Sequence, residues 1–181
     1  MPKVTVIIPA FNSERFIRSA IDSVLGQTYR DFEIVVVDDG SDDGTAEIAE
    51  SYHDPVRCIR KAKGGTSSAR NFGILDSTSE YIAFLDSDDL WLPHKLERQI
   101  AVLEANPDIG LCYVAIEQFG EGAYSRVEAD EYPDYCEALL LYSCIVTGSC
   151  SSVMMRRNLI EKIGVFDTNL TNLKTGNFGS G

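Results

Sequence analysis

Two clusters of carboxylates each follow an apolar run that predicts a buried strand. They comprise Asp38, Asp39, Asp42 and Asp43 after residues 32–37, and Asp86, Asp88 and Asp89 after residues 81–85. In an open α/β sheet, ligands bind beyond the carboxyl ends of the strands, where these clusters would meet. Carboxylates packed at one sheet edge raise one another's pKa unless a cation or hydrogen-bond donors compensate them. Because Mg²⁺ and Mn²⁺ prefer carboxylate and water oxygens, the pattern predicts a divalent metal.

Turn formation is the alternative explanation for both clusters, since Asp, Gly and Ser are ordinary turn residues. For Asp42 and Asp43 we favour that explanation, a tight loop that caps a helix. For Asp86, Asp88 and Asp89 we favour a ligand role, because three carboxylates within four residues after a buried strand are unfavourable without a partner.

A Gly-rich stretch before a predicted helix is a candidate phosphate site. Gly64 and Gly65 let the backbone approach a ligand closely, and Arg70, near the helix start, could reach a phosphate or a base. A loop that caps the helix explains the same glycines. The first strand is not followed by G-x-G-x-x-G, and the chain has no G-x-x-x-x-G-K-[ST], so the dinucleotide and P-loop fingerprints are missing. The remaining hypothesis is a diphosphate bridged by a metal.

Short apolar runs alternate with segments of helical periodicity, which predicts an α/β fold with a mainly parallel sheet flanked by helices. Predicted strands span residues 3–9, 32–37, 56–59, 81–85, 109–116 and 152–155. Predicted helices span residues 16–25, 45–52, 67–75, 93–103 and 159–163. Ser13 is expected to cap the first helix, and Pro93 to lie near the first turn of the fourth. Trp91 and Leu92 are assigned to the core, with a cofactor stack as the alternative, and His53 and His94 to surface or packing positions.

The 181 residues, 44% of them hydrophobic, predict one soluble globular domain. We place that domain at residues 1–170 and an atypical tail without apolar periodicity at residues 171–181. The acidic segment 118–137 is predicted to be a solvated loop, with a mobile lid or acceptor-facing loop as the alternative. The five cysteines form no C-x-x-C pair and are expected to be reduced and mostly buried.

The net charge of −12 argues against nucleic acid as a partner, because nucleic-acid binding depends on clustered Lys and Arg. No apolar run reaches the ~18 residues of a membrane span, and the N-terminus lacks the features of a signal peptide. We therefore expect a cytoplasmic protein without a membrane span, with a peripheral position at the inner membrane face as an alternative.

Five motifs, in this order, resemble those of the family 2 glycosyltransferases of the GT-A fold. They are PAFN (9–12), VVVDDGSDDGT (35–45), GGTSSARNFGI (64–74), YIAFLDSDDLWLP (81–93) and SSVMMRRNLIEKIGVFD (151–167). The resemblance covers residues 3–170 and depends on the order and spacing of all five motifs. It implies a UDP- or dTDP-linked sugar donor, a Mn²⁺ or Mg²⁺ cofactor, and transfer with inversion to a saccharide or lipid-linked acceptor.

The resemblance also implies roles for individual residues. The residues that would contact the nucleotide sugar are Pro9, Ala10, Asn12, Asp38, Asp39, Arg70, Asp86 and Ser87. Among them, Asp39 would contact the base, and Arg70 would lie near the base or the diphosphate. Asp86 and Asp88 match the D-x-D motif of the family, and either Asp88 or Asp89 would bind the metal that bridges the diphosphate.

The acceptor hydroxyl needs a general base, and the chain departs from the family pattern where that base is expected. Family members follow Phe-Asp with a Glu-Asp pair whose Asp is the base, whereas this chain has no carboxylate after Asp167. Asp167 itself is a candidate substitute, although its position matches the preceding motif. Alternatively, codons permitted for residues 172–181 read in another frame as Leu-Glu-Asp-Trp-Glu-Phe-Trp-Leu-Arg. The chain would then be a frameshifted fragment without its base and acceptor half, a hypothesis that sequencing the coding DNA tests.

Three other functions are alternatives. A sugar nucleotidyltransferase also uses acidic metal ligands on an α/β sheet, but its Gly-rich, Lys-bearing N-terminal loop is missing here. A phospho-acceptor signalling domain would explain Asp38 and Asp39, but the Asp pair of such domains follows the first strand. A non-catalytic nucleotide-binding fragment would need no general base.

Overall fold

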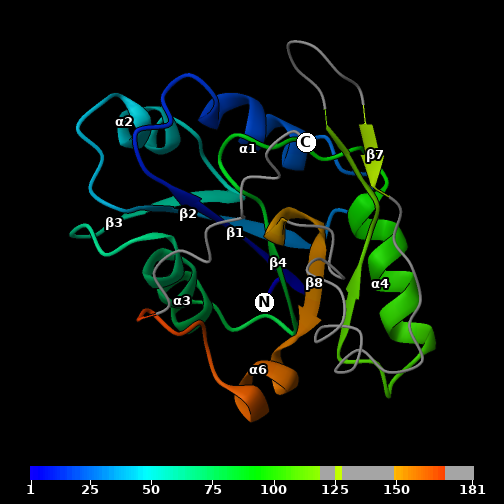
Figure 1. The fold of residues 1–181 in the computed structure, drawn as a ribbon. Helices are drawn as coiled ribbons and strands as arrows, with labels where there is room; N and C mark the ends of the chain where they lie inside the picture. The colour runs from blue at the N-terminus through cyan, green and yellow to red at the C-terminus, as the bar shows by residue number, and fades with distance from the viewer. Residues whose placement is uncertain (119–124, 128–148, 170–181) are drawn as a thin grey trace, which may run out of the picture.

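A computed structural model describes residues 1–118, 125–127 and 149–169, which form a central sheet between two layers of helices (Figure 1). The sheet has six strands in the order β3-β2-β1-β4-β8-β5. Three parallel pairings join β1 (Val4–Ala10), β2 (Phe32–Asp38), β3 (Val56–Arg60) and β4 (Tyr81–Phe84). Only β8 (Val153–Arg156) runs antiparallel to its neighbours, β4 and β5 (Leu111–Tyr113). The predicted α/β class with a mainly parallel sheet is confirmed.

The helices are α1 (Ile17–Leu25), α2 (Thr45–Glu50), α3 (Thr66–Asp76), α4 (Lys95–Ala105) and α6 (Arg157–Ile163). Because side chains alternate between the faces of a strand, Val6 and Ile8 belong to the core shared with α1 and α4. Ile7 belongs to the core shared with α3 and α6. At Gly73 of α3, an added Cβ would lie 2.6 Å from Ile7 Cγ2. The glycine therefore allows α3 to pack directly against β1.

Two predictions of local structure are wrong. The strand predicted at 109–116 ends at Tyr113, because β5 is a half-buried edge strand that pairs with β8. The chain then forms β6 (Ile116–Gln118), which pairs with β7 (Ser125–Val127) in a separate ribbon. The Ser13 side chain does not cap α1, because its hydroxyl bonds to Phe11 O and to the Ser87 hydroxyl instead. Helix α4 begins at Lys95, so Pro93 lies near its first turn, as predicted.

The remaining predictions have mixed outcomes. Trp91 is 7% exposed and lies in the core as predicted, whereas the core assignment of Leu92 is wrong, because its side chain is 72% exposed. His53 and His94 are exposed. The described cysteines, Cys58, Cys112 and Cys150, are free but only half-buried, so the expectation of mostly buried thiols is too strong. Apart from residue 118 and the β7 strand, the acidic segment 118–137 lies outside the described residues, as does the tail 171–181.

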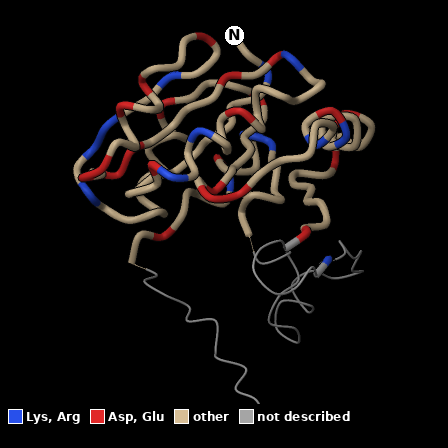
Figure 2. Tube along the Cα trace, turned by 90° about the horizontal axis from the view of Figure 1, so that it is seen from above, with Lys and Arg blue, Asp and Glu red and all other residues tan. Residues whose placement is uncertain are grey.

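Charged residues of both signs are interleaved along the described chain, as Figure 2 shows for Lys and Arg against Asp and Glu. Within the part of the chain that the structure describes, none of the helices combines the length and apolarity needed to cross a bilayer.

Candidate functional site

The loops after β1, β2 and β4 meet the start of α3 at the carboxyl edge of the sheet and form an open pocket of about 510 Å³. Its walls are formed by Pro9, Ala10, Phe11, Asp39, Thr66, Ala69, Arg70, Asp86, Ser87 and Asp88. Seven of these ten residues are ones that the sequence predicts for the site. Asn12, Asp38 and Asp89 are predicted site residues that do not line it.

Asp39 anchors the loop that begins α3. The residue is 3% exposed. Its Oδ1 accepts hydrogen bonds from Lys61 Nζ at 2.5 Å and Gly64 N at 2.9 Å, and its Oδ2 accepts one from Gly65 N at 2.6 Å. Gly65 has a φ of +87°, a conformation that favours glycine. The Gly-rich stretch is therefore a loop-to-helix connection that Asp39 holds against the pocket.

Asn12 joins two of the loops. Its N–H donates to Ser41 Oγ at 2.9 Å, and its Oδ1 accepts from Asp42 N at 2.9 Å. Asp38 is 2% exposed, with Oδ2 lying 3.4 Å from Ser41 N and Oδ1 without a hydrogen-bond partner among the described residues. These two side chains organise the loop backbone beside the pocket.

Asp43 stabilises the start of α2. It accepts hydrogen bonds from Glu14 N at 3.1 Å and Thr45 N at 3.0 Å, and also from the Thr45 hydroxyl. Desolvation acts to raise the pKa of Asp43, but the hydrogen bonds from Thr45 and Glu14 hold it below its ordinary value. The geometry agrees with the turn explanation favoured for this residue.

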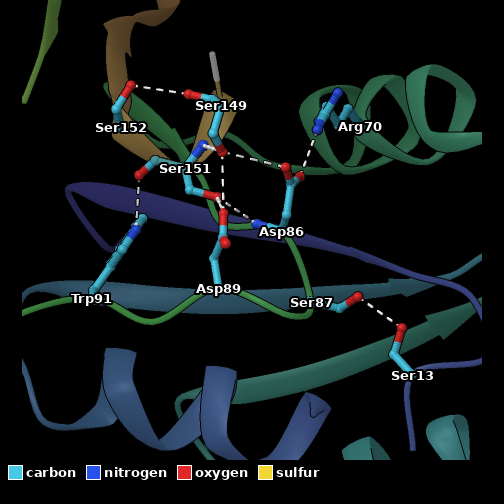
Figure 3. Close-up of polar contacts among 9 residues, drawn as sticks. All are labelled: Ser13, Arg70, Asp86, Ser87, Asp89, Trp91, Ser149, Ser151 and Ser152. Atoms are coloured by element: carbon cyan, nitrogen blue, oxygen red, sulfur yellow. Dashed lines mark hydrogen bonds and ion pairs between the residues drawn. The ribbon is translucent and has the colours of Figure 1, made fainter. Parts of the chain in front are cut away.

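In the β4–α4 loop, the Asp86 and Asp88 carboxylates differ in their partners (Figure 3 shows Asp86). Asp86 Oδ1 forms an ion pair with Arg70 Nη2 at 2.5 Å. The Arg70 guanidinium also lies over the Phe166 ring, 5.5 Å from its centroid, and its Nε has no hydrogen-bond partner among the described residues. Asp88 is exposed on the pocket wall and forms no hydrogen bond or ion pair with any described residue. Asp88 is thus the carboxylate of this loop that is available to a ligand.

Asp89 points away from the pocket towards a distant segment of the chain (Figure 3). Its Oδ2 accepts hydrogen bonds from Ser151 Oγ at 2.6 Å and Ser149 Oγ at 3.1 Å. These serines lie at the short 3₁₀ turn η1 (Cys150–Ser152), and Trp91 Nε1 donates to Ser151 O at 2.8 Å. Asp89 therefore fastens the acidic loop to η1.

A buried lysine, Lys95 of α4, lies next to Trp91. Lys95 Nζ is 3.8 Å from the centroid of the Trp91 ring and donates to Gln99 Oε1 at 2.6 Å. Burial lowers the pKa of Lys95 to about 7. The same Gln99 donates through Nε2 to Ser152 O at 2.9 Å, which ties α4 to η1.

Asp167, the candidate base, does not line the pocket. Its carboxylate is exposed and accepts a hydrogen bond from Asn169 N at 2.8 Å. The preceding Phe166 is docked on the domain: its ring contacts Phe84 edge-on with centroids 5.4 Å apart. Asn71 holds the Phe166 backbone through two hydrogen bonds, at 2.7 and 2.9 Å.

The pocket fits a metal that is completed by its ligand. Across the described ranges, no group of three or more His, Cys, Asp or Glu side chains could hold an ion by itself. Mg²⁺, however, usually keeps several waters and binds through one or two carboxylates together with substrate phosphates. An unpartnered Asp88 on the pocket wall suits that arrangement, whereas Asp89 is occupied by two hydroxyl groups.

Sequence reasoning missed several residues of the site. Phe11 is 38% exposed on the pocket wall, with Lys63 Nζ 3.7 Å from its ring centroid. Its position inside the PAFN motif is the signal that could have identified it. Ser151 opens the motif at residues 151–167, which is the signal that could have identified it, whereas Ser149 had no such signal. The carboxylate that both serines contact is 60 and 62 positions away from them.

The comparisons with known proteins agree on one family. The profile described as Glycosyl transferase family 2 matches residues 5–164. The chain is 39% identical over 178 residues to an uncharacterised glycosyltransferase of Rickettsia typhi, covering 93% of this chain and 55% of that relative. It is 48% identical over 92 residues to the uncharacterised glycosyltransferase EpsJ of Bacillus subtilis, covering 49% of this chain and 27% of EpsJ. The chain thus spans about half the length of the Rickettsia relative.

Solved structures show the same fold. The chain is similar to S. aureus TarS 1–349 in complex with UDP-GlcNAc, with a TM-score of 0.73, 26% identity, and coverage of 88% of this chain and 47% of that one. Similarity to the mannosyltransferase PcManGT from Pyrobaculum calidifontis, in complex with GDP-Man and Mn²⁺, has a TM-score of 0.68 at 24% identity, covering 93% and 48%. The expected GT-A fold is confirmed.

Proposed function

The chain belongs to glycosyl transferase family 2, and from that membership we propose that its pocket binds a nucleotide-sugar donor with a divalent metal. The sugar is transferred with inversion to a hydroxyl group of a saccharide or lipid-linked acceptor. The donor is a UDP- or dTDP-sugar. The observation that carries this proposal is the unpartnered Asp88 on the wall of a pocket that also contains Arg70 and Asp39.

We assign different pocket residues to different parts of the donor. Phe11 is 38% exposed on the pocket wall, and aromatic rings can stack on nucleobases. We assign Asp39, which follows β2 on the pocket wall, to the base, and Arg70, on the same wall, supplies a cation for a phosphate. Both residues are already held by hydrogen bonds or ion pairs, so little ordering is required when the donor binds.

Asp88 is the residue that we assign to the metal, with Mn²⁺ and Mg²⁺ as the candidate ions. When bound, such an ion offsets negative charge on the leaving nucleoside diphosphate as a Lewis acid. Asp86 stays paired with Arg70 and limits the charge that the metal must balance. TarS and PcManGT support the donor and metal assignments through their complexes with UDP-GlcNAc and with GDP-Man and Mn²⁺.

The general base is not assigned to any residue of the pocket wall. Asp167 remains a candidate, since it directly follows Phe166, which contacts Arg70 at the pocket. A second proposal is that this chain binds the donor without transferring the sugar, and the turn of the Asp167 carboxylate onto Asn169 favours it. The frameshift hypothesis for residues 172–181 makes the same prediction, and the coding DNA tests it.

Calorimetric titration of UDP into the purified 181-residue chain, with and without Mn²⁺, tests the donor site. We expect binding that strengthens when Mn²⁺ is present, and circular dichroism of the same sample checks that the chain is folded. No binding by folded protein to UDP, dTDP or GDP would contradict the proposal. Pyrophosphate release from UTP and a sugar phosphate would favour the nucleotidyltransferase alternative.

A further inference from the structure

We propose that Ser149 and Ser151 are positioning residues for metal binding, an inference that rests on the donor site proposed above. Their hydroxyl groups hold the β4–α4 loop in one conformation, in which Asp86 and Asp88 line the pocket and, of these two, Asp88 has no partner among the described residues. The serines do not line the pocket themselves, so they act through the loop.

Ser149 and Ser151 contact the β4–α4 loop through hydrogen bonds to Asp86 and Asp89 (Figure 3). Ser151 Oγ donates to Asp89 Oδ2 at 2.6 Å and accepts from Asp86 N at 2.9 Å, so one hydroxyl grips the loop at both ends. Ser149 Oγ lies 3.1 Å from Asp89 Oδ2 and 3.5 Å from Asp86 Oδ2, between the two carboxylates. Ser151 N in turn donates to Ser149 Oγ at 3.0 Å, which orients that hydroxyl towards the acids.

Charge explains why the loop needs these donors. Three carboxylates within four residues repel one another, and an unheld loop would relieve the repulsion by moving them apart. Arg70 compensates Asp86, and the two hydroxyls satisfy Asp89 without neutralising it. Asp88 therefore has no partner among the described residues and lies beside a fixed neighbour, which is the arrangement that favours a cation.

The serines are themselves held by the core. Trp91 Nε1 bonds to Ser151 O, and Ser152 Oγ donates to Ser149 O at 2.9 Å. Ser151 and Ser152 are 7% and 1% exposed. Since donors that orient metal ligands work only when their own position is fixed, this packing allows the hydroxyls to act on the loop.

The test compares Ser151→Ala and Ser149→Ala with the wild-type chain and with Ser152→Ala, which removes a hydroxyl of the same turn that contacts no carboxylate. Mn²⁺ binding in the presence of UDP is followed by the loss of the free Mn²⁺ signal in electron paramagnetic resonance. UDP binding without metal is measured by calorimetry, and thermal unfolding is recorded for every variant. Ser149→Thr keeps the hydroxyl at a half-exposed position and serves as the conservative rescue.

We expect Ser151→Ala to weaken Mn²⁺ binding about tenfold, with Ser149→Ala close behind and metal-free UDP binding changed by less than about twofold. Ser149→Thr should bind Mn²⁺ like the wild type, and Ser152→Ala should weaken Mn²⁺ binding less than Ser149→Ala does, because the Ser152 hydroxyl acts only through the Ser149 carbonyl. Equal weakening of metal-free and metal-dependent binding, or no change in either, would overturn the inference. If Ser151→Ala does not fold, the comparison of Ser149→Ala with Ser149→Thr decides whether the hydroxyl group is needed for Mn²⁺ binding. Failure of the wild-type chain to bind Mn²⁺ with UDP overturns the donor site instead, and this inference with it.

Discussion

The β2–α2 and β4–α4 loops have similar compositions and different chemistry. Both follow buried parallel strands and carry several aspartates at the same sheet edge. In the β2–α2 loop, Asp39 and Asp43 accept hydrogen bonds from backbone N–H groups at the starts of α3 and α2. In the β4–α4 loop, Asp86 and Asp89 are held by side chains from other segments, and Asp88 is left without a partner.

This difference shows that an acidic cluster is informative only once its hydrogen-bond donors are known. A carboxylate that accepts several backbone N–H groups has its charge satisfied and serves the fold. A carboxylate left exposed beside satisfied neighbours is available to a cation. The following variants test whether the β2–α2 loop contributes mainly to stability and the β4–α4 loop mainly to metal binding.

The largest expected effect belongs to Asp39→Ala. The change leaves the Gly64 and Gly65 N–H groups and the largely buried Lys61 ammonium without their acceptor. We expect the free energy of unfolding to fall by roughly 3 kcal/mol, and metal-free nucleoside binding to weaken. Urea denaturation and calorimetry measure the two effects.

Asp42→Ala is the matched control for Asp39→Ala, because the Asp42 side chain is exposed and only its backbone N–H is bonded, to Asn12. We expect its stability to stay within about 0.5 kcal/mol of the wild type. An Asp39→Ala variant with wild-type stability and affinity would remove Asp39 from both the loop anchor and the base pocket.

Asp88→Asn should have the opposite profile. Because the Asp88 side chain has no partner among the described residues, its loss should leave thermal stability unchanged. Mn²⁺-dependent UDP binding should weaken about 100-fold, which corresponds to roughly 2.7 kcal/mol. Calorimetry with and without metal measures the change, and wild-type affinity in this variant would rule out Asp88 as the metal ligand.

Lys95→Met tests how the buried charge of Lys95, next to Trp91, affects stability. The folded-state pKa of Lys95 is lowered to about 7, so above pH 7 the unfolded chain binds more protons than the folded one. The stability of the wild type should therefore gain from Lys95 deprotonation as the pH rises from 7 towards the ordinary lysine value of 10.5. At pH 6 the methionine variant should be more stable by about 2 kcal/mol, since it removes a buried charge that has no carboxylate partner.

The pH series distinguishes Lys95 from other groups that titrate in the same range. Burial raises the pKa of Cys58 to about 11, which lowers stability as the pH rises and opposes the Lys95 effect. The informative quantity is therefore the stability of the variant relative to the wild type, which should fall steadily as the pH rises from 7 towards 10.5. A constant difference across the series would show that Lys95 is not the titrating group.

Asp43→Ala should have the smallest effect. Loss of the hydrogen bonds at the start of α2 should lower the free energy of unfolding by about 1 kcal/mol at pH 7. Because the folded-state pKa of Asp43 is lowered, its stabilisation is lost as the pH falls below 3.8, and the variant and wild type should converge there. Weakened Mn²⁺-dependent UDP binding would contradict the separation of the two loops.

Much of the fold was predictable because it depends on local periodicity. The buried runs of β1, β2 and β4 and the turn role of Asp43 follow from residue type and spacing alone. The pocket was predictable because the carboxyl ends of parallel strands share one edge of the sheet. The five motifs of the family resemblance added the assignments of Asp39, Arg70 and the D-x-D residues.

The contacts that decide between neighbours were not predictable. The choice between Asp88 and Asp89 depends on hydroxyl groups about 60 residues later in the chain. Ser151 opens the last of the five motifs, but nothing in the motif indicates that its hydroxyl contacts Asp89. Ser13 was misassigned for the same reason, because its hydroxyl is used by Ser87 on another loop. The strand at 109–116 was overextended because apolar residues at a sheet edge do not reveal which strand they will meet.

Arg70 makes the donor pocket and the segment at Phe166 parts of one energetic system. Its guanidinium binds Asp86 in the pocket and covers the Phe166 ring, and the neighbouring Asn71 holds the Phe166 backbone. A phosphate that draws Arg70 away from Phe166 therefore changes the free energy of docking of that segment. Reciprocity then requires that docking or release of the segment change donor affinity by the same factor. Nucleotide binding at the pocket and docking of the segment at Phe166 are thus thermodynamically coupled.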